Sequence, residues 1–334
     1  MMTVKVVCYG VRAVEVPFFE KLNKYGYQLI LEATLLNDEN VVLTKGAQAV
    51  IVRGNCKTDR KNIAKMSDFG VKYLLTRTVG FNHIDLEATK EFGLEVARVP
   101  AYSPNAISEL AVTLAMTLLR NVAHTLNKTR IKDFTVDAAM FSKEIRNCTV
   151  GVLGTGRIGL TTAKLFKGLG AKVVAFDVFE NQAAKEVVDY MPLDKVLAIS
   201  DVVSVHIPYI KGETDKFIDT YFLSQMKTDA VLVNTSRGEL QDDEAILAAI
   251  ESNKLRGFGT DVFAGEAEFF FKNMEQEPLS NPIVEQLISY YPRVIVTPHI
   301  GSYTDEALTN MVEISYKNLH EFLTTGTCEN IVGS

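Results

Sequence analysis

The feature that most constrains the fold is a glycine-rich loop together with the segments on either side of it. The pattern consists of an apolar run, the loop GTGRIG, a stretch of helical spacing and a second apolar run, at residues 148–153, 154–159, 160–169 and 171–176. Asp177 closes the second run, 177 − 159 = 18 positions after Gly159. This order predicts a strand–loop–helix–strand unit that binds a dinucleotide, because glycines let backbone N–H groups approach a pyrophosphate at a helix N-terminus.

The loop also indicates which dinucleotide is bound. Its residues are expected to contact the cofactor: Gly154, Thr155, Gly156, Arg157, Ile158 and Gly159. Asp177 can accept hydrogen bonds from ribose hydroxyls, and its negative charge would repel a 2′-phosphate. Neither Val178 nor Phe179 supplies a cation to offset that charge. The sequence therefore predicts NAD rather than NADP.

The rest of the chain repeats the alternation of short apolar runs and longer helical patterns. Further strands are expected at residues 4–9, 47–52, 71–76, 202–206, 230–234, 257–260 and 294–297. A single long, buried helix is expected over residues 106–126, with Ser103 as its N-cap and Pro104 as its first residue. Strands that alternate with helices predict an α/β fold: two Rossmann-like domains with doubly wound parallel sheets and a cleft between them.

The length of 334 residues fits two domains. The expected crossings make the first domain discontinuous, with residues 1–102 plus 300–334 as the substrate domain and residues 103–299 as the NAD-binding domain. Lys and Arg number 35 and Asp and Glu 41, so the net charge of −6 argues against a nucleic-acid partner. Four scattered cysteines favour neither disulfides nor a metal site, and no apolar run is long enough to cross a membrane. We therefore expect a cytoplasmic protein without a membrane partner.

Three chemically active residues follow later predicted strands, where ligands bind in open α/β sheets. Arg237 can bind a substrate carboxylate and polarise a keto oxygen. His299 can supply the proton that the carbonyl oxygen needs as a hydride arrives, and Glu266 can orient the imidazole. A guanidinium, a carboxylate and an imidazole together favour the reduction of a 2-oxoacid.

With these residues the sequence resembles the D-specific 2-hydroxyacid dehydrogenase family along essentially its whole length. The resemblance is carried by YSPNAISELAVTLAMTLLRN, TVGVLGTGRIG, DVVSVHIP, VLVNTSRGEL, GTDVFAGEAEFFF and VIVTPHIGSYT. It implies that Arg237, Glu266 and His299 form the catalytic triad and that the protein is a homodimer. It also implies a substrate carboxylate on the backbone of Val79 and Gly80, with Tyr102 in the pocket. Further cofactor contacts implied by the resemblance are His206, Pro208, Thr235, Ser236 and Asp261. Asp261 would hold Arg237 or the nicotinamide amide.

The sequence constrains the identity of the substrate side chain less than it constrains the type of reaction. Arg53 follows the expected strand 47–52, so its cation can pair with the distal carboxylate of 2-oxoglutarate. Ser302 stands where several relatives carry a bulky aromatic residue and would enlarge the pocket. The segments RGNC and HIGSYTDEA resemble the (R)-2-hydroxyglutarate enzyme. These features favour the NADH-dependent reduction of 2-oxoglutarate to (R)-2-hydroxyglutarate.

Other functions remain open from the sequence alone. Arg53 could instead be a surface cation paired with a nearby acid. Tyr102 and the run Phe269–Phe271 could shape an apolar pocket for a D-lactate or D-2-hydroxyisocaproate dehydrogenase, although the Phe run could equally be core or dimer packing. A non-catalytic NAD-sensing protein is possible on the same fold, but the intact triad argues against it.

Overall fold

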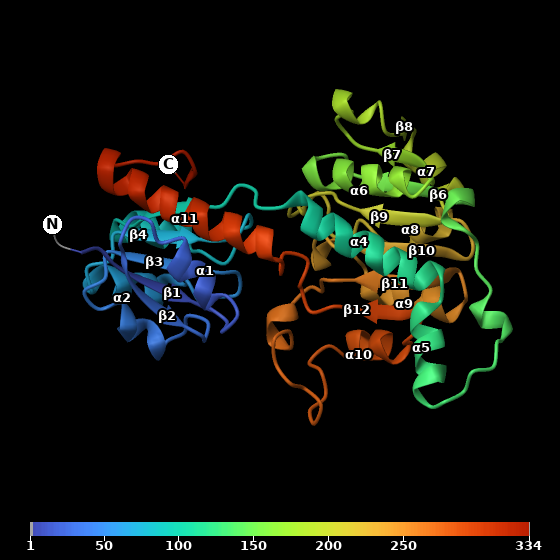
Figure 1. The fold of residues 1–334 in the computed structure, drawn as a ribbon, viewed down its shortest axis with the longest axis horizontal. Coiled ribbons are helices and arrows are strands. Elements are labelled where there is room, and N and C mark those ends of the chain that lie inside the picture. Colours follow the sequence, from blue (N-terminus) through green and yellow to red (C-terminus); the bar gives the residue numbers. More distant parts are fainter. Residues whose placement is uncertain (1–2, 334) are drawn as a thin grey trace. The chain divides into compact units, whose positions relative to one another are not determined.

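The computed structural model describes residues 3–333, which form two compact units. One unit comprises Met1–Ser103 and Tyr303–Ser334, and the other comprises Pro104–Ser302. The chain thus leaves the first unit after Ser103 and returns to it after Ser302, whereas the sequence pattern placed these crossings after residues 102 and 299 (Figure 1).

The first unit contains a six-stranded sheet in the order β13-β5-β4-β3-β1-β2. Its strands are β1 (Lys5–Tyr9), β2 (Gln28–Glu32), β3 (Ala49–Val52), β4 (Tyr73–Thr76), β5 (Glu95–Arg98) and β13 (Ile331–Val332). Its helices are α1 (Val16–Lys21), α2 (Arg60–Asp68), α3 (Leu86–Phe92) and α11 (Asp305–Thr325). All pairs are parallel except β13 with β5, which is antiparallel.

Alternate residues of these strands bury against opposite faces of the sheet, as the side-chain period of two requires. Val7 and Val50 pack with Ile63 and Met66 of α2, in one apolar cluster. Their neighbours Val6, Cys8 and Ile51 belong to a second cluster, with Val312, Tyr316 and Leu319 of α11. Helices therefore cover both faces, which explains why the strands consist of continuous apolar runs.

The second unit contains a seven-stranded, fully parallel sheet in the order β12-β11-β10-β9-β6-β7-β8. Its strands are β6 (Thr149–Leu153), β7 (Lys172–Phe176), β8 (Asp189–Tyr190), β9 (Val202–Val205), β10 (Ala230–Asn234), β11 (Leu255–Thr260) and β12 (Val294–Val296). Its helices are α4 (Pro104–Leu119), α5 (Val122–Arg130), α6 (Arg157–Gly168), α7 (Leu193–Ile199), α8 (Thr220–Gln225), α9 (Asp243–Glu251) and α10 (Pro282–Ser289). After β6 the chain adds β7 and β8 on one side of that strand, and it then adds β9, β10, β11 and β12 on the other side. The switch point where such sheets bind ligands is therefore at β6 and β9.

The prediction of one uninterrupted helix over residues 106–126 is wrong. The structure has two helices, α4 and α5, because Asn121 takes a φ of 50° and ends the first one. α4 begins at Pro104 as expected and buries Ala111, Leu114 and Leu118, whereas α5 buries only Ala123. Within residues 3–333 no single helix is long and apolar enough to cross a bilayer. α4 and α5 reach that length and composition only as a pair bent by 66°.

Candidate active site

The glycine loop forms a tight turn between β6 and α6. Gly154 has a φ of +85°, and a Cβ on Gly159 would lie 1.9 Å from the carbonyl oxygen of Gly154. Only residues without a side chain allow this approach. α6 begins at Arg157 rather than at residue 160, because Gly156 is its N-cap. Ile158 and Gly159 therefore belong to the first turn of the helix and not to the loop.

The N-terminus of α6 is open in a way that suits a phosphate. Gly156 provides no side-chain hydrogen bond to the first turn, whereas Asp242 caps α9 through the amide of Ala245. A Cβ at Gly156 would meet nothing within 4 Å. The first N–H groups of α6 therefore point into space that an anion can fill.

Asp177 follows β7 beside this loop. Its carboxylate accepts hydrogen bonds from the hydroxyl of Thr155 at 2.9 Å and from the amides of Thr155 and Phe179. Burial alone would raise the pKa of Asp177, but these hydrogen bonds outweigh it and hold the pKa below its usual value. The side chain is therefore an anion, as a ribose-binding acid must be. Tyr190, which the sequence analysis missed, shares a hydrogen bond of 2.6 Å with the Thr155 hydroxyl.

The segments after β9 and β10 supply the other expected cofactor residues. Among residues 3–333, the buried hydroxyl of Thr235 is one of a few side-chain groups without a hydrogen-bond partner. Ser236 donates to the carbonyl of Ile207 at 2.6 Å, which ties its loop to the segment that contains Pro208. His206 shares a hydrogen bond of 2.9 Å with Ser204, and burial lowers its pKa to about 4. The orphaned hydroxyl and the open helix terminus fit a bound dinucleotide.

His299 and Glu266 form a hydrogen-bonded pair. Nδ1 of His299 contacts Oε1 of Glu266, while the other carboxylate oxygen of Glu266 accepts the amide of Phe263 at 3.0 Å. The imidazole is partly exposed, and its Nε2 remains for a ligand, whereas the carboxylate is mostly buried. The left-handed Gly265, with a φ of 72°, places Glu266 at the start of a short 3₁₀ turn. This pair can hold a proton on the imidazole and present it.

Asp261 holds the backbone around His299, which the resemblance did not imply. Its carboxylate accepts hydrogen bonds from the Thr297 hydroxyl at 2.6 Å and from the amides of Ile300 and Gly301. The side chain therefore braces the backbone on both sides of His299, which itself has a φ of 51°. Burial raises the pKa of Asp261, against these hydrogen bonds.

Arg237 lies in the loop after β10 and points its guanidinium to a local acceptor. Nη1 donates to the carbonyl of Ser236 at 2.7 Å. Asn234 fixes this loop, because its Nδ2 donates to the carbonyl of Arg237 at 2.9 Å. Arg237 thus comes from the same carboxyl edge as Glu266 and His299, all within the second unit.

In the first unit, the carboxyl edge of the sheet carries a cluster of arginines. Arg12, Arg53 and Arg77 follow β1, β3 and β4, with Glu15 as the carboxylate among them. Arg77 is buried and donates to Glu15 at 3.0 Å and to the carbonyl of Gly10 at 2.7 Å. Arg12 contacts Glu15 at 3.5 Å. Burial, reinforced by the positive charges of Arg12 and Arg77, lowers the pKa of Arg53 to about 10.

The other predicted substrate residues lie partly in each unit. In the first, Arg98 donates to the carbonyl of Val79 at 3.1 Å, and the Thr78 hydroxyl donates to that of Gly80 at 2.7 Å. The carbonyl of Tyr102 accepts from Asn310 of α11 at 2.6 Å. Ser302, half-buried, is the last residue of the second unit.

Several residues around the site escaped sequence analysis. Arg77 directly follows a strand as Arg53 does, so the signal that selected Arg53 could have found it, whereas Arg12 stands three residues after the end of β1. Gly10 and Glu15 carry no such signal, because their relevance depends on which strands are neighbours. Within the run Phe269–Phe271, the side chains of Phe269 and Phe270 are buried against Phe263, so these two are core residues.

The chain is similar to known proteins along nearly its whole length. Residues 112–301 match the family model described as D-isomer specific 2-hydroxyacid dehydrogenase, NAD binding domain. An aromatic 2-oxoacid reductase of Clostridium sporogenes is 39% identical over 98% of both chains. The crystal structure of a D-lactate dehydrogenase from Treponema pallidum superposes with a TM-score of 0.90 at 34% identity, covering 98% of this chain and 99% of that one. An NAD-complexed 2-hydroxyacid dehydrogenase from Lactobacillus delbrueckii ssp. bulgaricus gives 0.83 at 34% identity, covering 98% and 100%.

Proposed function

This chain belongs to the D-isomer specific 2-hydroxyacid dehydrogenases, which are NAD-dependent oxidoreductases, and within that family we propose that it reduces 2-oxoglutarate to (R)-2-hydroxyglutarate. The comparisons with known proteins confirm the family resemblance, the α/β fold and the NAD cofactor that were inferred from the sequence. The choice of 2-oxoglutarate rests on the arginine cluster at the carboxyl edge of the first unit.

The residues of the second unit have distinct parts in the reaction. Bound NADH supplies a hydride to C2 of the oxoacid. His299 donates a proton from Nε2 to the carbonyl oxygen, and Glu266 stabilises the imidazolium through Nδ1 and fixes the orientation of the ring. Arg237 binds the C1 carboxylate and polarises the keto group. Asp261 keeps the His299 backbone in place.

The arginine cluster favours a substrate whose side chain is an anion. Arg12, Arg53, Arg77 and Glu15 together carry a net charge of 3 − 1 = +2. Burial disfavours the charged form of Arg53, as the lowered pKa shows, and a second anion nearby would relieve that cost. A distal carboxylate such as that of 2-oxoglutarate supplies the anion, whereas the methyl group of pyruvate and an aromatic ring do not.

The test compares substrates and Arg53→Ala. NADH oxidation is followed with 2-oxoglutarate, pyruvate, 4-methyl-2-oxopentanoate and phenylpyruvate at matched concentrations. We expect 2-oxoglutarate to give the highest kcat/KM in the native enzyme. Arg53→Ala is expected to lower kcat/KM for 2-oxoglutarate about 100-fold, since a charged hydrogen bond contributes roughly 3 kcal/mol. The same variant should change pyruvate turnover less than about 3-fold.

Arg60→Ala serves as the control, because Arg60 is an exposed cation of α2 paired with Glu91. Arg60→Ala should leave kcat/KM for both 2-oxoglutarate and pyruvate unchanged. Equal losses on 2-oxoglutarate and pyruvate in Arg53→Ala would refute the proposed substrate. If phenylpyruvate gave the highest kcat/KM, the proposed activity would instead be the reduction of aromatic 2-oxoacids, for which the Clostridium sporogenes relative is named.

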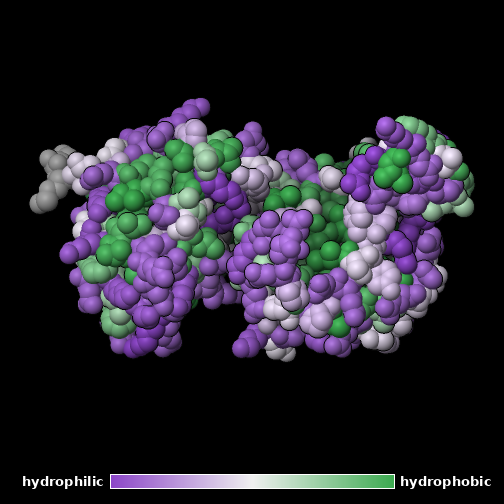
Figure 2. Space-filling model, turned by 90° about the horizontal axis from the view of Figure 1, so that it is seen from below, coloured by the Kyte–Doolittle hydropathy of each residue, from purple (hydrophilic) through white to green (hydrophobic). Residues whose placement is uncertain are grey.

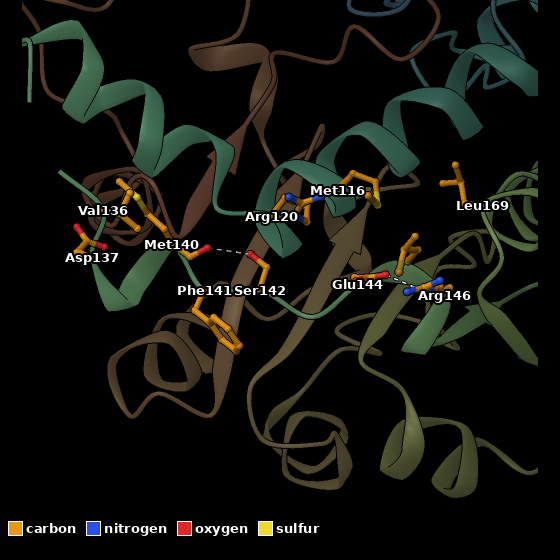
Figure 3. Close-up of a pocket in the computed structure, with 11 residues that line it drawn as sticks. Met116, Arg120, Val136, Asp137, Met140, Phe141, Ser142, Glu144, Arg146 and Leu169 are labelled. Atoms are coloured by element: carbon orange, nitrogen blue, oxygen red, sulfur yellow. Dashed lines mark hydrogen bonds and ion pairs between the residues drawn. The ribbon is translucent and has the colours of Figure 1, made fainter. Parts of the chain in front are cut away.

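We also propose that the enzyme is a homodimer and that the segment after α5 forms part of its interface. Figure 2 shows hydrophobic side chains in green among hydrophilic ones on the surface. The segment after α5 contains the apolar residues Phe134, Val136 and Phe141, each at least 75% exposed. It borders a groove of about 590 Å³, in which Met116 of α4 and Met140 also lie (Figure 3).

The charges of this groove support a second copy as its occupant. Arg120, Arg146, Asp137 and Glu144 all line the groove, and Arg146 pairs with Glu144, so the surface carries both signs (Figure 3). A patch with both signs can be self-complementary across a two-fold axis. Light scattering should give twice the chain mass for the native protein and the chain mass for Phe141→Asp. Tyr221→Asp, at a comparably exposed aromatic residue of α8, should remain a dimer. A native monomer would disprove the proposal.

A further inference from the structure

We infer that Gly10 determines substrate specificity, because the absence of its side chain gives Arg53 the space in which the guanidinium is held. The inference rests on the proposed function and names a second residue on which the recognition of an anionic substrate side chain depends. Gly10 and Arg53 both lie at the carboxyl edge of the sheet in the first unit.

The register of the sheet brings these two residues together. β1 and β3 are parallel neighbours, with Val6 opposite Ala49 and Cys8 opposite Ile51. Gly10 directly follows the end of β1 and Arg53 directly follows the end of β3, so both residues lie at the carboxyl edge where these two strands are neighbours. A side chain at position 10 can therefore compete with that of Arg53.

The distances show that this competition is direct. A Cβ built on Gly10 would lie 2.6 Å from Cδ and 2.9 Å from Cγ of Arg53. It would also lie 3.0 Å from a methyl group of Leu35. The aliphatic stem of Arg53 therefore occupies the volume that any larger residue at position 10 would need.

The backbone at Gly10 has little freedom to yield instead. Its amide donates to the carbonyl of Thr34 at 3.0 Å, and the amide of Val11 donates to Glu32 at 2.9 Å. Its carbonyl accepts the buried Arg77 at 2.7 Å. An added methyl group would therefore displace the rotatable stem of Arg53 rather than the turn. The guanidinium would move while the fold persists.

A second reason for a glycine at this position is its φ of +67°, which strains most side chains. Gly26 separates the two effects. It lies in the same unit with a φ of +70°, and a Cβ there would meet nothing within 4 Å. Gly26→Ala therefore introduces the backbone strain alone, and Gly10→Ala introduces the strain together with the contact to Arg53.

The experiment measures kcat/KM for 2-oxoglutarate and for pyruvate in Gly10→Ala, Gly26→Ala, Arg53→Ala and the double variant Gly10→Ala/Arg53→Ala. Gly10→Ala should lower the ratio of 2-oxoglutarate to pyruvate activity about 10-fold, and Gly26→Ala should leave it unchanged. The double variant should have the ratio of Arg53→Ala alone, because Gly10 acts through Arg53. Gly10→Asn repeats the test with less backbone strain, since Asn tolerates this conformation.

Two outcomes overturn the inference in distinguishable ways. If Arg53→Ala is selective but neither Gly10 variant changes the ratio more than Gly26→Ala does, the inference fails and the proposed function stands. The inference also fails, with the proposed function intact, if the effects of Gly10→Ala and Arg53→Ala multiply in the double variant. If Arg53→Ala itself reduces both substrates equally, the proposed function fails and the inference fails with it.

Discussion

The carboxyl edges of the two sheets carry opposite chemistry. In the first unit, Arg12, Arg53 and Arg77 gather around one carboxylate, and positive charge is in surplus among them. In the second, Asp177 and Asp261 accept backbone N–H groups, so their charges hold loops in place. The difference teaches that charge serves different ends at the two edges: the first gathers positive charge in surplus, whereas the carboxylates of the second, which also carries Arg237, position the glycine loop and the backbone around His299.

The largest effect should come from replacing His299, the proposed proton donor at the second edge. His299→Gln keeps a polar side chain but cannot donate the proton, so kcat should fall about 10²- to 10⁴-fold. The loss should be equal for 2-oxoglutarate and pyruvate, in contrast to Arg53→Ala. NADH binding, measured by fluorescence titration, should stay within about 3-fold of the native value. A variant that keeps a tenth of the native kcat would contradict the role of His299.

An intermediate effect is expected at Asp177. Asp177→Ser removes the carboxylate that is proposed to bind the ribose, and with it the repulsion of a 2′-phosphate. The ratio of kcat/KM for NADH to that for NADPH should fall at least about 10-fold, which corresponds to roughly 1.4 kcal/mol. The ratio of 2-oxoglutarate to pyruvate activity should not change, because the first edge is untouched. A change in substrate preference without a change in cofactor preference would reverse the assignment of the two edges.

The prediction furthest from catalysis concerns stability and Asp243, a carboxylate of the second unit that accepts a hydrogen bond from the side-chain amide of Gln241 at 2.8 Å. Burial raises its pKa to about 6, against 3.8 for an unperturbed Asp. The folded state therefore holds the proton more tightly than the unfolded chain, and stability falls as pH rises from about 4 to 6. The shift corresponds to a destabilisation of at most about 3 kcal/mol above pH 6.

Asp243→Asn should accordingly unfold at a higher urea concentration than the native protein at pH 7, and the difference should vanish near pH 4. Asp194→Asn is the matched control, since Asp194 is an exposed acid in the first turn of α7. A stability difference between Asp243→Asn and the native protein that is independent of pH would contradict the assigned cause.

Local patterns predicted much of the second unit. The strand at residues 230–234 has the bounds expected, and the glycine loop, α6 and Asp177 follow in the expected order. These features depend on neighbours in sequence. The break at Asn121 was not predicted, because a helical apolar pattern continues through it and the bend is set by a single left-handed residue. The bracing role of Asp261 was not predicted either, because its partners lie 36 to 40 positions further along the chain.

The sequence by itself determined the α/β class and the strand–loop–helix order of the glycine loop, because period and glycine spacing are local properties, and its family resemblance supplied the proposed triad. Only the tertiary structure decided which strands are neighbours. Placing β1 between β2 and β3 brings Gly10 against Arg53, and placing β4 beside β3 adds Arg77 to Glu15. Charges and side-chain volumes that are 43 and 62 positions apart, 53 − 10 and 77 − 15, interact only after the sheet has formed.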